Sequence, residues 1–348
     1  MEKQKIIIST RLDRSLADAV GEVEHDRLFV LCDETTRRLC WPVASETACM
    51  KDARLITIPA GDEHKSLESI AHVWSELQRM GATRHSLMVN LGGGMVTDLG
   101  GFAASTFKRG IAYINIPTTL LSMVDASVGG KTGINFGGLK NEVGVFNNAR
   151  SVILDAVFLA SMDHENILSG YAEMLKHGLI ADEPTWAALL NFDLDRRTVD
   201  IGMIADSVGV KQRFVTADPT EQGIRKALNL GHTAGHAFES WSLRRRPVLH
   251  GFAVAWGLVA ELYLSCVKTG FPTDRMRQTV QFITEHYGRL PITCDDYPEL
   301  IELMRHDKKN SGSDINFTLL GGIGDIRINQ HASEAEIKEA LDFYREGF

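Results

Sequence analysis

The stretch "MVNLGGGMVTDLGGFAAS" (residues 88–105) passes from an apolar run through three consecutive glycines into a helical pattern. Glycines at such a turn let backbone N–H groups approach a pyrophosphate closely, and the helix N-terminus adds a favourable electrostatic field. The stretch does not follow the G-x-G-x-x-G fingerprint, so a tight turn that requires positive φ stays as the alternative. The pattern predicts an α/β domain that binds a nucleotide at this turn.

The rest of the N-terminal half alternates short apolar runs with helical patterns. The runs are rich in Ile and Val and bounded by turn residues, which is typical of buried strands. Strands are predicted over residues 5–9, 27–32, 54–59, 86–91, 112–117 and 151–155. Residues 66–81 predict a helix with Ser66 as N-cap and Gly81 past its end. The alternation predicts a Rossmann-like parallel sheet, covered on both faces, over residues 1–160.

The strand signals nearly vanish after about residue 160, and helical patterns dominate the remaining chain. Helices are predicted over residues 167–182, 198–215, 226–241, 250–266 and 275–288, and from about Glu334. One strand pair, 315–320 with 325–329, interrupts them. The expected second domain, residues 161–348, is therefore mainly α-helical, and ligand sites favour the crevice between two such domains.

Composition restricts the class of protein. A chain of 348 residues exceeds what one hydrophobic core usually supports, and a net charge of −8 argues against a nucleic-acid partner. Five cysteines without a C-x-x-C pair indicate reduced thiols. The N-terminal apolar run is too short for a secretory signal, and no stretch approaches the ~18 apolar residues of a membrane span. We expect a cytoplasmic protein without a membrane partner.

The stretch "GHTAGHAFES" (residues 231–240) places His232 and His236 four apart, hence on one face of a helix. Zinc proteases use this spacing, but Thr233 stands where their motif requires a glutamate. The pair could be a metal site, an acid–base pair, or part of a tightly packed helix in which Gly231 and Gly235 admit a neighbour. The local residues leave all three interpretations open.

Two further features bear on nucleotide and phosphate binding. Asp33 ends the second predicted strand, where a carboxylate can accept ribose hydroxyls and would repel a 2′-phosphate, which favours NAD over NADP. The run "VGGKTG" (residues 128–133) looks like half a P-loop, but the motif needs glycine where Asp125 stands. The P-loop is therefore excluded, although Lys131 lies in a glycine-rich loop where it could meet a phosphate.

Several motifs extend over nearly the whole chain: "LGGGMVTDLGGFAASTFKRG" (91–110), "INIPTTLLSMVDASVGGKTGIN" (114–135), "LKNEVG" (139–144), "YAEMLKHG" (171–178), "RKALNLGHTAGHAFE" (225–239), "LHGFAVAWG" (249–257) and "DKKN" (307–310). In this order they resemble the 3-dehydroquinate synthase family of sugar phosphate cyclases. The resemblance implies an NAD-binding α/β domain, a helical metal-binding domain and a homodimer.

The resemblance also implies cofactor contacts. The family's metal ligands match Glu173, His232 and His250; two imidazoles and a carboxylate suit zinc or cobalt and leave a position open. The implied NAD contacts are Asp33, Asp62, Lys65, Gly93, Gly94, Met95, Asp98, Thr118, Thr119, Leu121, Asp125, Lys131, Lys140, Phe158 and Ser161. Asp62 stands where the family usually has Glu, Thr35 where Asn is common, and Ser161 where relatives often have Thr.

The family's substrate, 3-deoxy-D-arabino-heptulosonate 7-phosphate, carries a carboxylate and a phosphate. The implied contacts are Asp125, Lys131, Lys140, Asn141, Lys176, Lys211, Arg225, Asn229, His236 and either Lys308 or Lys309, with Arg109 reaching across the dimer. The implied reaction is transient oxidation by NAD, phosphate elimination, re-reduction and aldol closure to 3-dehydroquinate. His236 would move the C5 hydroxyl proton, and Gly231 and Gly235 would clear room for cofactor and substrate.

Three other functions are the alternatives to 3-dehydroquinate synthesis. A metal-dependent polyol dehydrogenase needs no paired anion clamps. Other sugar phosphate cyclases act on substrates without a carboxylate and typically differ at the positions of Lys211, Arg225, Asn229 and His236. A non-catalytic NAD-sensing module would not require an open three-ligand metal site.

Overall fold

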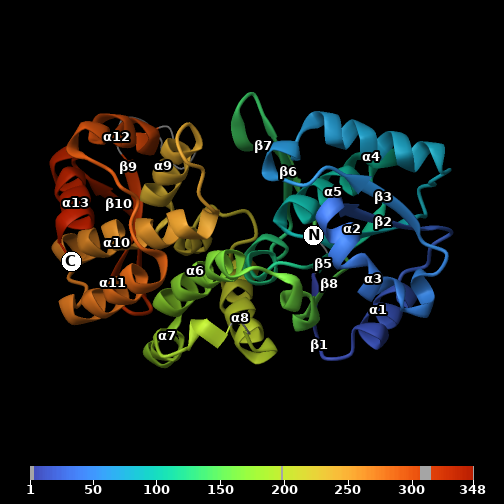
Figure 1. Ribbon diagram of the computed structural model, residues 1–348, viewed down its shortest axis with the longest axis horizontal. Coiled ribbons are helices and arrows are strands. Elements are labelled where there is room, and N and C mark those ends of the chain that lie inside the picture. Colours follow the sequence, from blue (N-terminus) through green and yellow to red (C-terminus); the bar gives the residue numbers. More distant parts are fainter. Residues whose placement is uncertain (1–3, 197–198, 306–314, 348) are drawn as a thin grey trace. The chain divides into compact units, whose positions relative to one another are not determined.

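The computed structural model describes residues 4–196, 199–305 and 315–347, and the chain forms two compact units (Figure 1). The first consists of Met1–Asp163 with Thr198–Val208, and the second of His164–Arg197 with Gly209–Phe348. Helix α8 (Ile201–Ala217) is divided between them after Val208.

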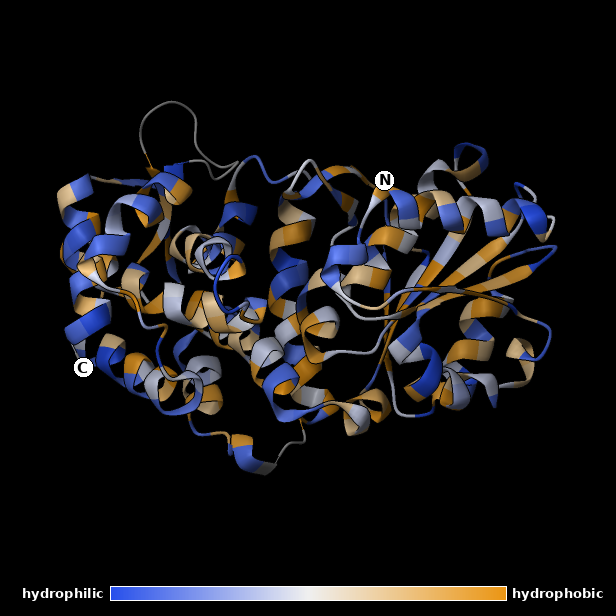
Figure 2. Ribbon diagram, turned by 45° about the horizontal axis from the view of Figure 1, so that its top comes forward, coloured by the Kyte–Doolittle hydropathy of each residue, from blue (hydrophilic) through white to orange (hydrophobic). Residues whose placement is uncertain are grey.

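The first unit is built on a parallel sheet with the strand order β1-β8-β5-β4-β2-β3. Its strands are β1 (Lys5–Ser9), β2 (Leu28–Asp33), β3 (Arg54–Ile58), β4 (Leu87–Gly92), β5 (Ala112–Pro117) and β8 (Ser151–Asp155). Every residue of β2, β4 and β8 is buried, as expected where helices cover both faces, and Figure 2 shows the strands largely in hydrophobic colours. The parallel sheet predicted from six apolar runs is confirmed.

Helices of the first unit follow the strands. They are α1 (Leu12–Gly21), α2 (Glu34–Leu39), α3 (Trp41–Ser45), α4 (Leu67–Arg79) and α5 (Gly94–Thr106). Ser66 caps α4 as predicted, because its hydroxyl accepts from the Ser69 N–H at 3.4 Å. Ile70, Val73 and Leu77 form the buried stripe of α4, which the helical spacing anticipates.

A hairpin of β6 (Lys131–Phe136) and β7 (Leu139–Phe146) was not predicted. Lys131 is therefore the first residue of a strand, and its expected place in a loop is wrong. The hairpin lacks a strand signature because every residue of β7 is exposed, so no face shows alternating apolar burial. Gly133 and Gly144 face each other in the register, and a Cβ on either would collide with the opposite backbone.

The second unit is mainly helical, as predicted. It contains α6 (His164–Ala181), α7 (Glu183–Leu190), α9 (His232–Leu243), α10 (His250–Thr269), α11 (Thr273–Tyr287), α12 (Tyr297–Arg305), α13 (Glu334–Glu346) and the antiparallel pair β9 (Ile315–Gly322) and β10 (Asp325–Ala332). Helix α10 packs against α6, α9, α11, α13 and β9 (Figure 1). By length and composition α10 could cross a membrane, but 72% of its apolar window is buried within the protein, which is the pattern of a core helix.

The expected helix over residues 226–241 is broken. A 3₁₀ helix (Ile224–Asn229) precedes Gly231, whose φ of 79° is left-handed, and α9 begins only at His232. A Cβ on Gly231 would lie 2.8 Å from the Leu258 side chain, and one on Gly235 would lie 2.9 Å from the Ala253 carbonyl. These glycines therefore admit α10. The expectation that they clear room for cofactor and substrate is wrong.

Candidate functional site

The glycine turn after β4 forms the start of the first candidate site. The first-turn N–H groups of α5, as in every helix, have no intrahelical acceptors. The N-cap is Gly93, so no side chain at that position accepts from them. A Cβ on Gly93 would lie 3.2 Å from Thr119, and one on Gly94 would lie 3.1 Å from Ala126. The backbone of this turn therefore lies in close contact with the segment that follows β5. The N-terminus of α5, with its first-turn N–H groups, is a suitable place for a phosphate.

Asp33 ends β2 as predicted, at the same sheet edge as Gly92, because β2 and β4 are adjacent and parallel. Its Oδ1 accepts from the Thr36 N–H at 2.8 Å, and the Thr36 hydroxyl lies 3.0 Å from the Asp33 N–H, forming a capping box for α2. The structure gives Asp33 a capping role. Its contact with a ribose stays a prediction.

Five sequence-predicted residues of the first unit lie together. The Lys65 ammonium pairs with Asp98 Oδ2 at 2.6 Å and contacts Asn141 Oδ1. Lys140 Nζ lies 3.3 Å from Asp62 Oδ2. Lys65 is only 4% exposed, so its charge requires these partners. The contacts connect β7 to α5 and to the segment after β3, and they group proposed cofactor and substrate residues from three separate parts of the sequence.

Most other predicted residues of the first unit follow the carboxyl ends of strands, where ligands of parallel sheets bind. Met95 lies on α5, Thr118 and Thr119 directly follow β5, and Leu121 and Asp125 lie at and within the π-helical turn Ser122–Ala126. Phe158 and Ser161 lie in the 3₁₀ helix Ala156–Ser161 after β8. Arg109 differs: it precedes the amino end of β5, in a turn where Lys108 and Arg109 have φ of 49° and 70°.

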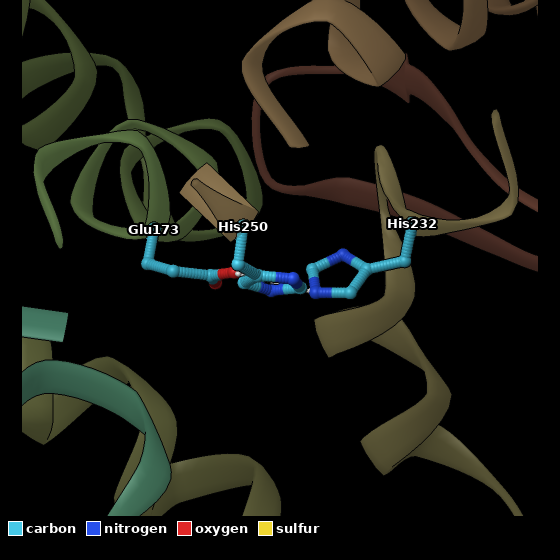
Figure 3. A group of neighbouring side chains, drawn as sticks. All are labelled: Glu173, His232 and His250. Atoms are coloured by element: carbon cyan, nitrogen blue, oxygen red, sulfur yellow. Dashed lines mark ion pairs between the residues drawn. The ribbon is translucent and has the colours of Figure 1, made fainter. Parts of the chain in front are cut away.

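The second unit brings together the three predicted metal ligands (Figure 3). Glu173 comes from the middle of α6, and His232 and His250 are the first residues of α9 and α10. The Nε2 atoms of His232 and His250 lie 3.3 and 3.4 Å from Glu173 Oε1. The three side chains point toward one another, and their ligand atoms could hold one metal ion.

The opposite ring nitrogens orient the two imidazoles. His232 Nδ1 lies 3.0 Å from the Leu230 carbonyl oxygen, and His250 Nδ1 lies 3.1 Å from Glu239 Oε2. Because both partners are acceptors, each Nδ1 carries a proton. Each Nε2 faces Glu173 Oε1 and would present a lone pair to a metal ion that displaces its proton. Carboxylate or carbonyl partners of this kind orient histidine ligands and raise their basicity.

The electrostatics of the cluster favour a bound cation. Glu173 is fully buried; burial opposes its charge, but Lys176 and His232 hold the pKa of its carboxyl well below the usual range. Burial also opposes charge on His250, yet Glu239 and Glu173 raise the pKa of its imidazole to about 10. Among the described residues, neither oxygen of Glu173 accepts a well-aligned hydrogen bond. A buried, ionised carboxylate beside two oriented imidazoles is a suitable binding site for a divalent metal ion.

His236 lies on the same face of α9 as His232, as its spacing predicts. Its ring centroid is 5.3 Å from that of His232 and 5.9 Å from that of His250. It also forms a second group with Glu239 and His250 whose ligand atoms lie close enough to share an ion. Geometry alone therefore permits either a ligand or a proton-moving role for His236, and the latter stays our prediction.

The predicted substrate cations of the second unit are buried. Lys176 is 1% exposed, and its ammonium pairs with Glu173. Arg225 is also 1% exposed and donates from Nη1 to the Pro219 carbonyl at 2.6 Å. Lys211, on α8, is buried, and Asn229 donates to Glu221 Oε1 at 2.9 Å. Lys308 and Lys309 lie outside the described residues. A buried cation requires an anionic or polar partner, and Glu173 is that partner for Lys176.

Sequence reasoning missed two carboxylates beside the histidines. Glu239 follows His232 by seven residues and His236 by three, so helical spacing could have placed it on their face. Glu261, on α10, carries no such signal because its partners are backbone N–H groups of α9.

Comparisons with known proteins agree over the whole chain. Residues 55–169 match the family described as 3-dehydroquinate synthase N-terminal, and residues 170–310 match 3-dehydroquinate synthase C-terminal. A 3-dehydroquinate synthase of Parabacteroides distasonis is 52% identical, covering 100% of this chain and 99% of the relative.

Solved structures show the same fold. The 2-epi-5-epi-valiolone synthase of Streptomyces hygroscopicus, with NAD+ and Zn2+ bound, has a TM-score of 0.88 at 25% identity, covering 100% of this chain and 98% of the other. A 2-deoxy-scyllo-inosose synthase complexed with carbaglucose-6-phosphate, NAD+ and Co2+ has a TM-score of 0.85 at 22% identity, covering 99% and 96%.

Proposed function

The chain belongs to the 3-dehydroquinate synthase family, and on this premise we propose how its residues carry out the reaction. The enzyme is an NAD- and metal-dependent lyase that converts 3-deoxy-D-arabino-heptulosonate 7-phosphate to 3-dehydroquinate and phosphate. Within the site, the observation that best supports this function is that the side chains of Glu173, His232 and His250 meet around a buried carboxylate oxygen. Residues 1–160 are proposed as the NAD-binding domain and residues 161–348 as the metal- and substrate-binding domain.

Glu173, His232 and His250 would hold Zn2+ or Co2+, because they offer one carboxylate oxygen and two Nε2 lone pairs. The pyrophosphate of NAD+ would lie at Gly93 and Gly94, on the N-terminus of α5. When bound, NAD+ supplies a reversible hydride acceptor for substrate C5, and the metal ion polarises substrate hydroxyls.

The protein's own residues would bind, orient and move protons. His236 would take the proton of the C5 hydroxyl and later return it, because imidazole titrates near neutral pH. Lys131, Lys140, Asn141 and Lys176 would orient the phosphate for elimination, with a phosphate oxygen as the base. Contacts from Asp125, Lys211 and Asn229 would complete the substrate site. Arg225, with Lys308 or Lys309, would hold the carboxylate; a guanidinium binds it through two parallel hydrogen bonds.

The carboxylate clamp distinguishes this function from that of other sugar phosphate cyclases. Their substrates lack the carboxylate, so they need no buried counterpart of Arg225. In this chain Arg225 is 1% exposed and lies at the start of its 3₁₀ helix. Its backbone N–H donates to Asp218 Oδ2 at 3.2 Å, and its Nη1 donates to the Pro219 carbonyl at 2.6 Å. A buried guanidinium held in this way favours a carboxylate-bearing substrate.

The first prediction tests net redox. With the heptulosonate phosphate, NAD+ and Zn2+, phosphate should be released while NADH does not accumulate, because the hydride returns to C5 in each turnover. A phosphate assay and absorbance at the NADH band, recorded on one sample, measure both. Stoichiometric NADH would identify a dehydrogenase and contradict the synthase mechanism.

We further propose that the enzyme is a cytoplasmic homodimer and that Arg109 serves the partner's site. Arg109 is exposed and lies in a turn of three consecutive residues with positive φ, ending at Gly110. Non-glycine residues in this region are strained, and such strain is concentrated at functional sites. The turn presents Arg109 outward, as a residue that reaches another subunit requires.

The second prediction tests this role by subunit mixing. Arg109→Ala and Lys131→Ala homodimers should each be inactive, whereas their mixture should recover activity, since one site of a hybrid dimer retains both residues. Subunit exchange is followed by mass spectrometry of differently tagged chains. Exchange without recovered activity would place Arg109 in its own subunit's site or outside the reaction.

A further inference from the structure

A buried carboxylate caps α9 from the neighbouring helix. Glu261 of α10 is fully buried; its Oε2 accepts from the Gly231 N–H at 2.6 Å, and its Oε1 accepts from the Ala234 N–H at 3.0 Å. Both N–H groups belong to the first turn of α9 or its N-cap, the turn that presents His232. A negative charge at this end of a helix is electrostatically favourable.

The cap cannot come from the usual position. The N-cap is Gly231, which is in the left-handed region and makes no side-chain cap. A side chain there would collide with Leu258, and a Cβ on Gly257 would collide with the Gly231 carbonyl. Because α9 and α10 touch backbone to backbone at this point, the acceptor for the first-turn N–H groups has to reach across from α10. Glu261, one turn after Gly257, does so.

The contact continues through one peptide group to the metal ligand. The Leu230 carbonyl and the Gly231 N–H belong to the same planar peptide unit. Glu261 accepts from that N–H, and His232 Nδ1 lies 3.0 Å from that carbonyl oxygen. Consecutive hydrogen bonds polarise one another, so the carboxylate strengthens the carbonyl as an acceptor for the imidazole N–H. The opposite nitrogen, Nε2, is the one that faces Glu173.

We propose that Glu261 is a positioning residue for the metal site and that it acts on His232 through the Leu230–Gly231 peptide group. The inference rests on the proposed ligand set. Glu239 contacts His250 Nδ1 directly, so each histidine ligand has its own buried carboxylate: one in direct contact, and one relayed by a peptide. Glu261 thereby fixes the rotamer of His232 and raises the basicity of its Nε2.

The test compares Glu261→Gln with the wild-type full-length protein, using Co2+ as the probe. A glutamine retains one acceptor oxygen but turns an NH2 group toward one of the two N–H groups and removes the charge. The dissociation constant for Co2+, measured by chelator competition, should rise about 10–100-fold. The visible absorption spectrum of the bound Co2+ should also change, because a displaced imidazole alters the ligand field.

Glu336→Gln is the matched control. Glu336, on α13, also belongs to a helix cap of the same unit, because its Oε2 accepts from the N–H and the hydroxyl of the N-cap Ser333. It pairs with Lys268 of α10, and none of its hydrogen bonds or ion pairs within the described part of the chain involves His232, His236 or His250. Its loss should lower thermal stability while leaving the Co2+ affinity and spectrum unchanged. Wild-type affinity and spectrum in Glu261→Gln, despite lower stability, would overturn the proposal and leave Glu261 a structural cap.

A second variant covers the case in which Glu261→Gln does not fold. Glu261→Asp keeps the charge but withdraws it by one methylene, so the Co2+ affinity should fall and the spectrum should change. An Asp variant with the wild-type affinity and spectrum would overturn the proposal. If the wild-type protein itself binds no Co2+, the ligand assignment fails first, and this outcome is distinct from the failure of Glu261 alone.

Discussion

His236→Ala is expected to retain about one metal ion per chain while its turnover falls about 10²–10⁴-fold, the usual effect of removing a general acid–base group. The reason lies in the cluster geometry. Glu173 Oε1 is already approached by the Nε2 atoms of His232 and His250, at 3.3 and 3.4 Å. His236 lies one helical turn beyond His232 and is the residue that we propose to move the proton of the C5 hydroxyl.

His232→Ala should fail in a different way. It removes one of three ligands, so the dialysed protein should lose its metal together with its activity. Metal analysis of both variants, beside circular dichroism to confirm folding, distinguishes the two roles. Equal loss of metal in both would mean that His236 is a ligand and that the assignment of Glu173 or His250 is wrong.

Glu173→Gln should destabilise the metal-free protein by about 3–5 kcal/mol, because it leaves the buried Lys176 ammonium without its counter-ion. The loss should also abolish metal binding, since the only carboxylate of the ligand set is gone. Urea unfolding of chelator-treated wild type and variant at pH 7 measures the free energy of unfolding. Lys176→Met in the Glu173→Gln background should restore most of it, because the pair is then removed together.

The pH dependence follows from the lowered pKa of Glu173. A carboxyl group whose folded pKa is depressed contributes stability above its unfolded pKa, about 4.3 for Glu, and loses it as the pH falls through the folded value. The difference between the wild type and Glu173→Gln should therefore be full at pH 7 and should shrink below about pH 4.3. A difference that is independent of pH, or no rescue by Lys176→Met, would contradict the ion-pair explanation.

Local patterns predicted the elements of the sheet but not the hairpin. Each buried strand of the sheet is an apolar run because helices cover both of its faces, and burial of that kind is visible in a single sequence. In the hairpin β6–β7, every residue of β7 is exposed and Gly133 faces Gly144, so no face shows the alternating apolar burial that marks a strand in a sequence. The same limit applies to the helix break at Gly231, where a continuous helical pattern conceals a left-handed residue.

The sequence by itself determined the α/β and helical halves, the family motifs and the chemical types of the site: two imidazoles and a carboxylate from "YAEMLKHG", "NLGHTAGHAFE" and "LHGF". These follow from periodicity and residue identity, which are local properties. Only the tertiary structure decided that Gly231 and Gly235 admit α10, that Glu239 orients His250, and that Glu261 caps the helix bearing His232. Those contacts join residues on different helices or involve backbone N–H groups that every residue except proline possesses, so no residue pattern along the chain specifies them.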